Sequence, residues 1–600
     1  LLLDSGLFEA REDIENVPPC RVAGYSPDLE TLRLAEEHFP GITSPPAASE
    51  PLSVEAVYTI GSVGSIAQTA TSDMDVWVCY EPEGVGPAED ARLRRKLEQM
   101  ALWAQSEFGA EVHFFLMTLD EVRANDFGLS DKESTGSAQA LLLKEEFYRT
   151  ALRVAGKELL WWLTPPGADA EAWKDFRRAA LESPLLGRAR VTDLGRLDRV
   201  PAEEFFGASL WQIVKGLHSP YKSVLKLGLL EKYAGQDDAG GLLLCDQIKD
   251  AVTRRHSEAR LADPYTVLFR NLRDYYQGIG DTDAVGLLTD AFTLKAGIAD
   301  FDYAFGFPSV PEEMSFLAFL LDDREVTRET AQGLDRSWSF ARAMKAGATV
   351  SRFLINTYQR IQARLEEAGS RSGVRISPED LTRLGRQIQA NFAPRKHKVE
   401  RVPFLDLSAH YFPEFYFEAE KAPGKRPVWL VRGQESGRGK VSSKGMQILR
   451  KDADPAMLLT WLVVNGIYSP ATHVHGDRSV APMSVEDLKK ILQVLHEFFP
   501  LEEVFEMDME ETLRPERVTR AFFLPNLGVP QEVQKVAVVS VVYATNWGEL
   551  FCRTVPNPDA KLLKQASAFL HDILPQSTPE PPEMGLYLPK KSQCPRIRLI

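Results

Sequence analysis

The sequence has 600 residues, 44% of them hydrophobic and 26% charged, a composition typical of a folded protein with more than one domain. Its 85 acidic residues exceed its 70 basic ones, and the net charge of −15 argues against a protein that binds nucleic acid through its overall field. No run of about 18 apolar residues could span a membrane, and the five scattered cysteines form no CxxC pair, so we expect a protein of the reducing cytoplasm without a cysteine zinc site.

The N-terminal part of the chain predicts a small mixed-sheet domain within residues 1–165. Three short apolar runs are predicted strands, at residues 54–60, 74–78 and 112–117. Between the second and the third strand, residues 88–108 have the apolar period of an amphipathic helix. A sheet with at least one covering helix is therefore expected here.

The rest of the chain changes pattern twice. After the break at Pro165-Pro166-Gly167 the sequence is mostly helical by period, which predicts a helical domain over residues 166–375. Strand-like and helix-like stretches are then mixed, namely 414–418 and 536–543 as strands and 456–464 and 485–499 as helices. We expect an α+β protein whose third part, residues 376–600, is an α+β domain without catalytic groups.

The strongest chemical signal is a pair of aspartates after a Gly-Ser turn. The first strand runs into Gly61-Ser62, and the second carries Asp73 and Asp75, whose side chains share one face because strand residues alternate. Two carboxylates about 7 Å apart repel each other unless a cation neutralises them, and Mg²⁺ prefers oxygen ligands. Gly61 allows close backbone approach, and Ser62 with the amides that follow it can hydrogen-bond phosphate oxygens.

A third acid, Glu111, begins the next predicted strand and reaches the same end of the sheet if the two strands are neighbours. Three carboxylates can hold two metal ions, the arrangement that assists in-line phosphoryl displacement. The alternative is a solvated strand face, which the Gly-Ser turn and the acid-led strand disfavour. Trp77 shares the face of the aspartates and packs either beside a nucleotide or in the core.

Basic residues farther along the chain are candidates for phosphate binding. Ser219 is a good N-cap and Pro220 a good first helical residue, which places Lys222 in a first turn and Lys226 one turn later. A cation in the first turn opposes the helix dipole by about 0.3–1 kcal/mol, a cost that a bound anion offsets. Arg149, on a helix predicted over residues 138–154, is a further candidate. The alternative for all three is a solvated surface charge.

The residues around the two aspartates form a longer sequence pattern than the turn and the acidic pair alone. Gly61-Ser62-x-x-Ser65-Ile66-x-Gln68 followed by Ser72-Asp73-Met74-Asp75-Val76-Trp77-Val78-Cys79 resembles the polymerase-beta-like nucleotidyltransferase superfamily and, more closely, the class I adenylate cyclases of the enterobacterial type. Further blocks agree in order: Glu111-Val112-x-Phe114-Phe115-Leu116, Gly136-Ser137-x-Gln139, Leu141-Leu142-Leu143-x-Glu145-Glu146-Phe147-Tyr148-Arg149, Phe206-Gly207-Ala208-Ser209-Leu210-Trp211-Gln212 and Ser219-Pro220-Tyr221-Lys222-x-Val224-Leu225-Lys226.

The resemblance is dense over residues 16–294 and thinner afterwards. It departs from the family pattern at Ala138 and Lys144, neither of which is a candidate metal ligand. The chain begins with Leu1 rather than Met, and we expect a further segment to precede it.

The resemblance implies a nucleotidyltransferase-type sheet domain that converts ATP to 3′,5′-cyclic AMP and pyrophosphate. It implies two Mg²⁺ ions, with Mn²⁺ as a substitute, held by Asp73, Asp75 and Glu111, and it adds Ser65 to the nucleotide contacts. It also implies regulation through the C-terminal part by the glucose-specific phosphocarrier protein of the sugar phosphotransferase system. Two alternatives stay open at this point: a nucleotidyltransferase that passes AMP to a separate acceptor, and a catalytically inactive nucleotide-binding interaction protein.

Overall fold

The structure is a computed structural model in which the chain divides into two compact units. Unit 1 comprises Leu1–Gly216, Pro220–Arg336 and Phe353–Ile376, and unit 2 comprises Leu217–Ser219, Ser337–Arg352 and Ser377–Ile600. The structure describes residues 1–12, 17, 19–41, 52–69, 72–83, 85–127, 139–197, 199–216, 219–235, 242–254, 262–296, 340–367, 378–402, 412–420, 427–434, 446–501, 511–529, 536–556 and 581–588. Our division into three domains at residues 165 and 375 stays a prediction.

The N-terminal part of unit 1 is built on one mixed sheet. Its described strands are β1 (Cys20–Val22), β2 (Leu52–Ile60), β3 (Met74–Tyr80), β4 (Val112–Thr118) and β5 (Leu152–Gly156). They run in the order β1-β2-β3-β4, and β5 also pairs with β2; β1 with β2 and β3 with β4 are parallel pairs, whereas β2 is antiparallel to β3 and to β5. The three strands and the helix expected between residues 54 and 117 are confirmed.

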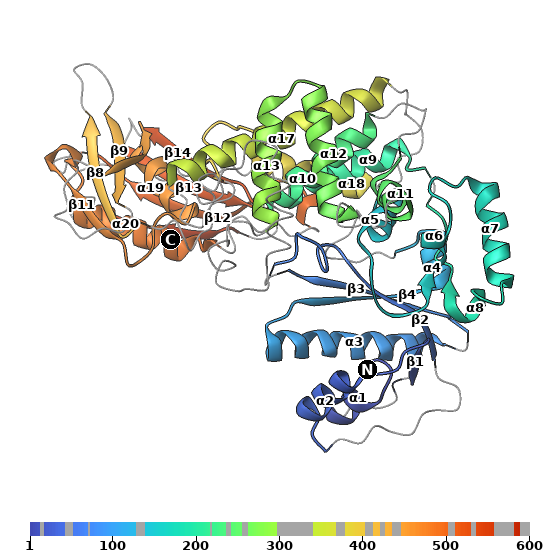
Figure 1. Ribbon diagram of the computed structural model, residues 1–600. Helices are drawn as coiled ribbons and strands as arrows, with labels where there is room; N and C mark the ends of the chain where they lie inside the picture. Colours follow the sequence, from blue (N-terminus) through green and yellow to red (C-terminus); the bar gives the residue numbers. More distant parts are fainter. Residues whose placement is uncertain are drawn as a thin grey trace, which may run out of the picture. The chain divides into compact units, whose positions relative to one another are not determined.

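Both faces of this sheet are covered. Helix α3 (Pro87–Phe108) packs on one face, where Val76, Val78 and Leu93 share a core (Figure 1). On the other face Trp77 shares a core with Phe147 of α5 (Ala140–Thr150). The alternation expected for β3 is therefore present, and its odd-numbered residues lie on the face that α5 covers. The remaining helices of this part are α1 (Leu7–Glu12), α2 (Leu29–His38) and α4 (Leu119–Ala124).

The predicted helix over residues 138–154 is shorter in the structure. Helix α5 ends at Thr150, and residues 152–156 become the edge strand β5. Backbone pairing with β2 supplies hydrogen bonds that another helical turn would have supplied, and Val154 is β-branched, which suits a strand. Arg149 stays on the helix, in its last turn.

Helices dominate the rest of unit 1, as predicted. They are α6 (Leu160–Leu163), α7 (Ala170–Glu182), α8 (Gly187–Arg190), α9 (Ala202–Lys215), α10 (Pro220–Ala234), α11 (Leu244–Arg254), α12 (Pro264–Gly278), α13 (Thr282–Lys295) and, from Phe353 onward, α17 (Phe340–Glu367), with a small pair of strands, β6 (Glu158–Leu159) and β7 (Val191–Thr192). Helices α10, α12 and α13 pack together. The last turns of α17 join them through Arg360, which donates two hydrogen bonds to the fully buried Glu231 of α10 at 2.7 and 2.9 Å.

Unit 2 places a buried helix against two sheets. Its elements are α18 (Pro378–Phe392), β8 (Glu414–Glu420), β9 (Val428–Gln434), β10 (Gln447–Asp452), α19 (Pro455–Val464), β11 (His473–Gly476), η4 (Arg478–Val480), α20 (Val485–Phe498), η5 (Glu511–Leu513), β12 (Val518–Pro525), β13 (Val538–Thr545), β14 (Leu550–Pro556) and β15 (Glu583–Leu586). The sheets have the orders β10-β9-β8-β11 and β14-β13-β12-β15. Helix α19 is apolar all round and packs on strands of both sheets, which explains why its sequence lacks a polar face.

The α+β fold class is confirmed, with a sheet domain, helices and a second sheet-containing region in chain order. Among the helices that the structure describes, none is both long and apolar enough to cross a bilayer.

Candidate active site

The two aspartates lie at the start of β3, on the face of the sheet that α5 covers. Asp75 pairs in register with Ile60 of β2 and with His113 of β4, and Asp73 precedes the strand by one residue. Asp73 is 41% exposed, whereas Asp75 is partly buried. Burial and then the nearby Asp73 carboxylate raise the pKa of Asp75 to about 6. The charged form of Asp75 is therefore unfavourable until a cation approaches it.

The third predicted ligand, Glu111, lies directly before β4. Its backbone oxygen accepts a hydrogen bond from the amide of Met74 at 2.9 Å, which confirms that the two strand ends are neighbours. Its side chain is 65% exposed and lies 3.1 Å from Nε2 of His113. Its role as a metal ligand stays a prediction. The sequence interpretation missed His113, although strand alternation places it on the same face as Glu111.

The Gly-Ser turn is held by other parts of unit 1. The amide of Gly61 donates to Thr150 Oγ1 at 3.0 Å, and Gly61 has a φ of 91°, which favours glycine. Ser62 is buried and its hydroxyl donates to Ser72, while the Ser65 hydroxyl donates to the backbone oxygen of Ser62 at 2.7 Å. These contacts shape the turn, and direct phosphate contacts by these residues stay predictions.

A second anchor of the turn was not expected from sequence. The amide of Ile66 donates to the Asp263 carboxylate at 2.9 Å, and the other oxygen of Asp263 caps α12 by accepting from Tyr265 and Thr266. Asp263 therefore caps α12 and also connects this helix to the turn between β2 and β3.

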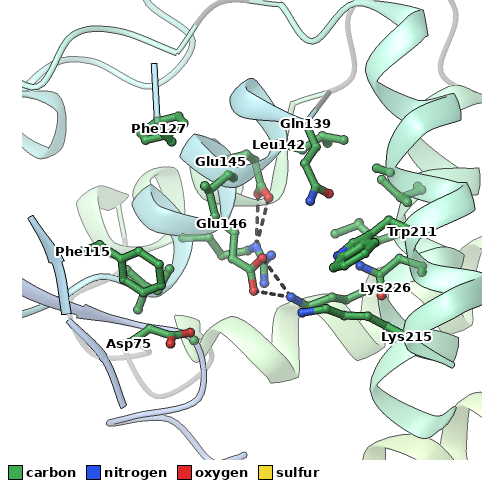
Figure 2. A pocket seen from close by; sticks show the side chains of 18 of the residues that line it. Asp75, Phe115, Phe127, Gln139, Leu142, Glu145, Glu146, Trp211, Lys215 and Lys226 are labelled. Carbon is green, nitrogen blue, oxygen red and sulfur yellow. Dashed lines mark hydrogen bonds and ion pairs between the residues drawn. The ribbon is translucent and has the colours of Figure 1, made fainter. Parts of the chain in front are cut away.

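A cavity of about 200 Å³ opens beside Asp75 in unit 1. Its polar side is formed by Asp75, Glu146, Lys215 and Lys226, and Figure 2 shows both lysines pointing toward Glu146. Its other walls are largely apolar and come from β2, β3, β4, α5, α9, α10 and the segment after α4: Ile60, Trp77, Phe115, Met117, Phe127, Leu142, Leu143, Ala208, Trp211, Leu229 and Leu230. Trp77 lines the cavity and stacks on Phe147 with centroids 4.3 Å apart, so its packing in the core is confirmed, and its contact with a nucleotide stays a prediction.

The two predicted lysines lie beside the acidic groups. Lys222 is 3.7 Å from Asp73, and Lys226 is 2.9 Å from Glu146. Burial alone would raise the pKa of Glu146, but Lys226 and Arg149 lower it to about 2. Two carboxylates and two lysines, contributed by the sheet end, α5 and α10, therefore form one charged group.

Further lysines were missed because they lie on other helices. Lys215 ends α9 and lines the cavity, and Lys295 ends α13. Burial, followed by repulsion from Lys222, lowers the pKa of Lys295 to about 8, although Asp73 opposes the shift. The ammonium of Lys295 lies 5.8 Å from the centre of the Tyr265 ring. Such a concentration of cations favours a polyanionic ligand.

Arg149 is buried rather than on the surface. Its guanidinium forms an ion pair with Glu145 at 3.2 Å, and both residues line the cavity. Glu145 also accepts a hydrogen bond from the Tyr233 hydroxyl at 3.2 Å. Arg149 therefore contributes to the wall of the cavity, and its contact with a phosphate stays a prediction.

Asp73 and Asp75 fit a divalent cation by the chemistry of their donor atoms. Burial and then the neighbouring Asp73 carboxylate raise the pKa of Asp75, and a bound cation would lower it. Within the described residues, no three acidic, histidine or cysteine side chains are gathered closely enough to hold a metal ion alone. Mg²⁺ is usually bound by one or two carboxylates together with substrate phosphates, so the two aspartates suffice on the protein side.

The two predicted lysines should respond differently to removal. We expect Lys222→Ala and Lys226→Ala each to raise the KM for a nucleoside triphosphate about tenfold, because each removes a charge-assisted phosphate contact. Only Lys226→Ala should lower the melting temperature of the ligand-free protein, since it leaves Glu146 without its 2.9 Å partner. Differential scanning calorimetry without nucleotide checks this; equal melting temperatures for both variants would contradict it.

Comparison with known proteins agrees with this geometry. A family model described as "Adenylate cyclase NT domain" matches residues 1–162, and one described as "Adenylate cyclase, class-I, second domain" matches residues 200–403. Together they cover the sheet, the cavity and the lysines of α10 and α13. No solved structure matches.

Curated relatives carry the same name. An adenylate cyclase of Yersinia intermedia is 31% identical over 75% of this chain and 52% of the relative, and one of Salmonella typhimurium LT2 is 30% identical over 80% and 56%. An adenylate cyclase of Escherichia coli K12 is 37% identical over 47% of this chain and 33% of its own length. The chain spans about half the length of the first two. On the two family models and these relatives, the chain belongs to the class I adenylate cyclase family.

Proposed function

We propose that this chain converts ATP to 3′,5′-cyclic AMP and pyrophosphate. The observation that carries the proposal is that Asp75 lines a cavity together with Lys215 and Lys226, while Asp73, on the same strand end, lies 3.7 Å from Lys222. A site with both a cation-binding acidic pair and several cations suits a metal-bound triphosphate. The names of the family models and of the relatives support the choice of reaction.

The chemistry of each side chain indicates its role in this reaction. Lys222, Lys226 and Lys295 bind the triphosphate and offset its charge, and the apolar part of the cavity receives the base. Asp73 and Asp75 hold the divalent cation, with Glu111 as a third ligand. When bound there, one Mg²⁺ would lower the pKa of the ribose 3′-OH and a second would balance the charge of the leaving pyrophosphate. The bond from the 3′-oxygen to the α-phosphorus forms as the bond to pyrophosphate breaks, and the hydroxyl proton leaves to solvent.

Product identification tests the proposal. Incubating the protein with ATP and Mg²⁺ should give cyclic AMP and pyrophosphate in equal amounts, and Mn²⁺ should support the same reaction. 3′-DeoxyATP lacks the attacking hydroxyl and should bind without turnover. Pyrophosphate release without cyclic AMP, with AMP joined to another molecule, would instead support a nucleotidyltransferase. Binding without any turnover of ATP would support an inactive nucleotide-binding protein.

Location and regulation belong to the same proposal. The four cysteines in the described residues, Cys20, Cys79, Cys245 and Cys552, are buried and form no disulfide, which supports the expected reducing cytoplasm. The regulatory role of residues 376–600 and the phosphocarrier protein as a partner rest on the resemblance alone. Co-sedimentation of the full chain with that phosphocarrier protein would test them.

A further inference from the structure

One wall of the cavity carries a buried polar atom without a partner. The side-chain oxygen Oε1 of Gln212, on α9, has no hydrogen-bond partner, although the residue is only 6% exposed. Gln212 lines the cavity. Among the cavity-lining residues that the structure describes, only Gln212 has a buried polar side-chain atom without a hydrogen-bond partner. An unsatisfied buried acceptor is unfavourable in a folded protein, and its presence in a cavity points to a donor on the ligand.

The shape and lining of the cavity indicate which part of a nucleotide lies there. Its volume of about 200 Å³ is smaller than the roughly 300–1,000 Å³ of pockets that enclose a whole drug-sized ligand, so it suits one ring system. Trp77, Phe115 and Phe127 provide flat apolar contacts of the kind on which bases pack. The charged groups Lys215 and Lys226 lie on the polar side, toward Asp75, where phosphates would be attracted (Figure 2).

We infer that Gln212 selects the base of the substrate, by accepting a hydrogen bond through Oε1 from the 6-amino group of adenine. The inference rests on the proposed binding of ATP and identifies the group of the base that the site recognises. Guanine and hypoxanthine carry an oxygen at position 6, which repels an acceptor that faces it, so Gln212 with Oε1 toward the base disfavours both bases. Gln212 is a specificity-determining residue, whereas Asp73 and Asp75 act on the reacting phosphate.

The test compares three substrates: ATP, purine riboside triphosphate, which differs from ATP only by hydrogen at position 6, and ITP, which has oxygen at position 6 and a hydrogen on N1. In the wild-type protein we expect kcat/KM for purine riboside triphosphate to be about tenfold to a hundredfold lower than for ATP, and lower still for ITP. The loss should lie in KM, with kcat little changed, because the contact is present equally in ground state and transition state. Equal kcat/KM values for all three would overturn the inference.

Gln212→Met keeps the length of the side chain and removes the acceptor. It should lower kcat/KM for ATP and bring the ratio of ATP to purine riboside triphosphate close to one. It should not lower the melting temperature of the ligand-free protein, since Oε1 has no partner to lose. Gln139→Met, which removes another amide from the same cavity, is the matched control and should keep the wild-type ratio. A wild-type ratio in Gln212→Met would overturn the inference.

A second variant and a binding measurement separate the loss of base recognition from a loss of folding or of turnover. If Gln212→Met is poorly folded, Gln212→Leu and the wild-type comparison of the three substrates decide. Binding of the 3′-deoxy forms of the same nucleotides, measured by equilibrium dialysis, needs no turnover. A protein that prefers 3′-deoxyATP over its 6-hydrogen analogue but makes no cyclic AMP from ATP would contradict the proposed function and support the role of Gln212. Cyclic AMP formation without any preference at position 6 would do the reverse.

Discussion

Replacing Asp75 with asparagine is expected to reduce cyclic AMP formation at least about a hundredfold while stabilising the ligand-free protein. The loss follows from removing a negative ligand for the cation. The stabilisation follows from the pKa of Asp75, which burial and the Asp73 carboxylate raise to about 6. Because the folded state favours the protonated carboxyl, this group stabilises the fold below the unfolded pKa near 4 and loses that contribution as pH rises through 6.

The measurement is the melting temperature of both proteins between pH 4 and pH 7 without divalent cations. The advantage of Asp75→Asn over the wild type should grow across this range, to about 1–3 °C at neutral pH. Asp120→Asn, at an exposed residue of α4 paired with Arg123, is the control and should show no such growth and normal activity. A constant difference across the range would show that the pKa of Asp75 is not raised in the folded protein, and normal turnover by Asp75→Asn would show that Asp75 does not hold the cation.

The second large effect is expected at Glu231, which follows Lys226 on α10. This fully buried carboxylate accepts hydrogen bonds from Arg360 of α17 at 2.7 and 2.9 Å and from Tyr276 of α12 at 2.6 Å. Glu231→Gln removes the main counter-charge of the guanidinium and leaves it only the more distant Asp281, at 3.7 Å, so we expect a loss of about 3 kcal/mol in the free energy of unfolding. Arg360 is one-third exposed, which keeps the loss at the lower end for buried pairs.

Urea unfolding followed by circular dichroism measures this loss. Because α10 also carries Lys222 and Lys226, the KM for ATP should rise with the loss of stability. Glu366→Gln makes the same chemical change at an exposed residue of α17. It should leave the free energy of unfolding and the KM for ATP unchanged. An unfolding midpoint equal to that of the wild type would mean that the Glu231 contacts do not stabilise α10.

The sheet could be predicted from sequence because its signals are local. Strand alternation placed Asp73 and Asp75 on one face, and the structure puts Trp77 of the same strand on the α5 side and Val76 on the α3 side. The end of α5 was missed because residues 152–154 are compatible with either helix or strand, and pairing with β2 decides between them. That pairing is a long-range contact that no window of sequence contains.

The difference between local signals and long-range contacts also explains which site residues could be predicted from sequence. The acidic pair and the lysines of α10 lie in short motifs with a physical reason for their spacing. Asp263 and Lys295 reach the site from positions about 190 and 220 residues farther along the chain than the aspartates, and only packing of α10 with α12 and α13 brings them there. Gln212 stood inside a block of the resemblance, but only the structure reveals that its oxygen is buried without a partner.

A crystal structure of the full chain with Mn²⁺ and 3′-deoxyATP would test the central claim most directly, because the anomalous scattering of Mn²⁺ locates the cation independently of the nucleotide. We predict a Mn²⁺ peak within coordination distance of the Asp73 and Asp75 carboxylates, with the triphosphate toward Lys222 and Lys226 and the base in the cavity beside Gln212. A Mn²⁺ peak away from both aspartates, or a triphosphate bound outside the reach of these lysines, would contradict the proposed active site.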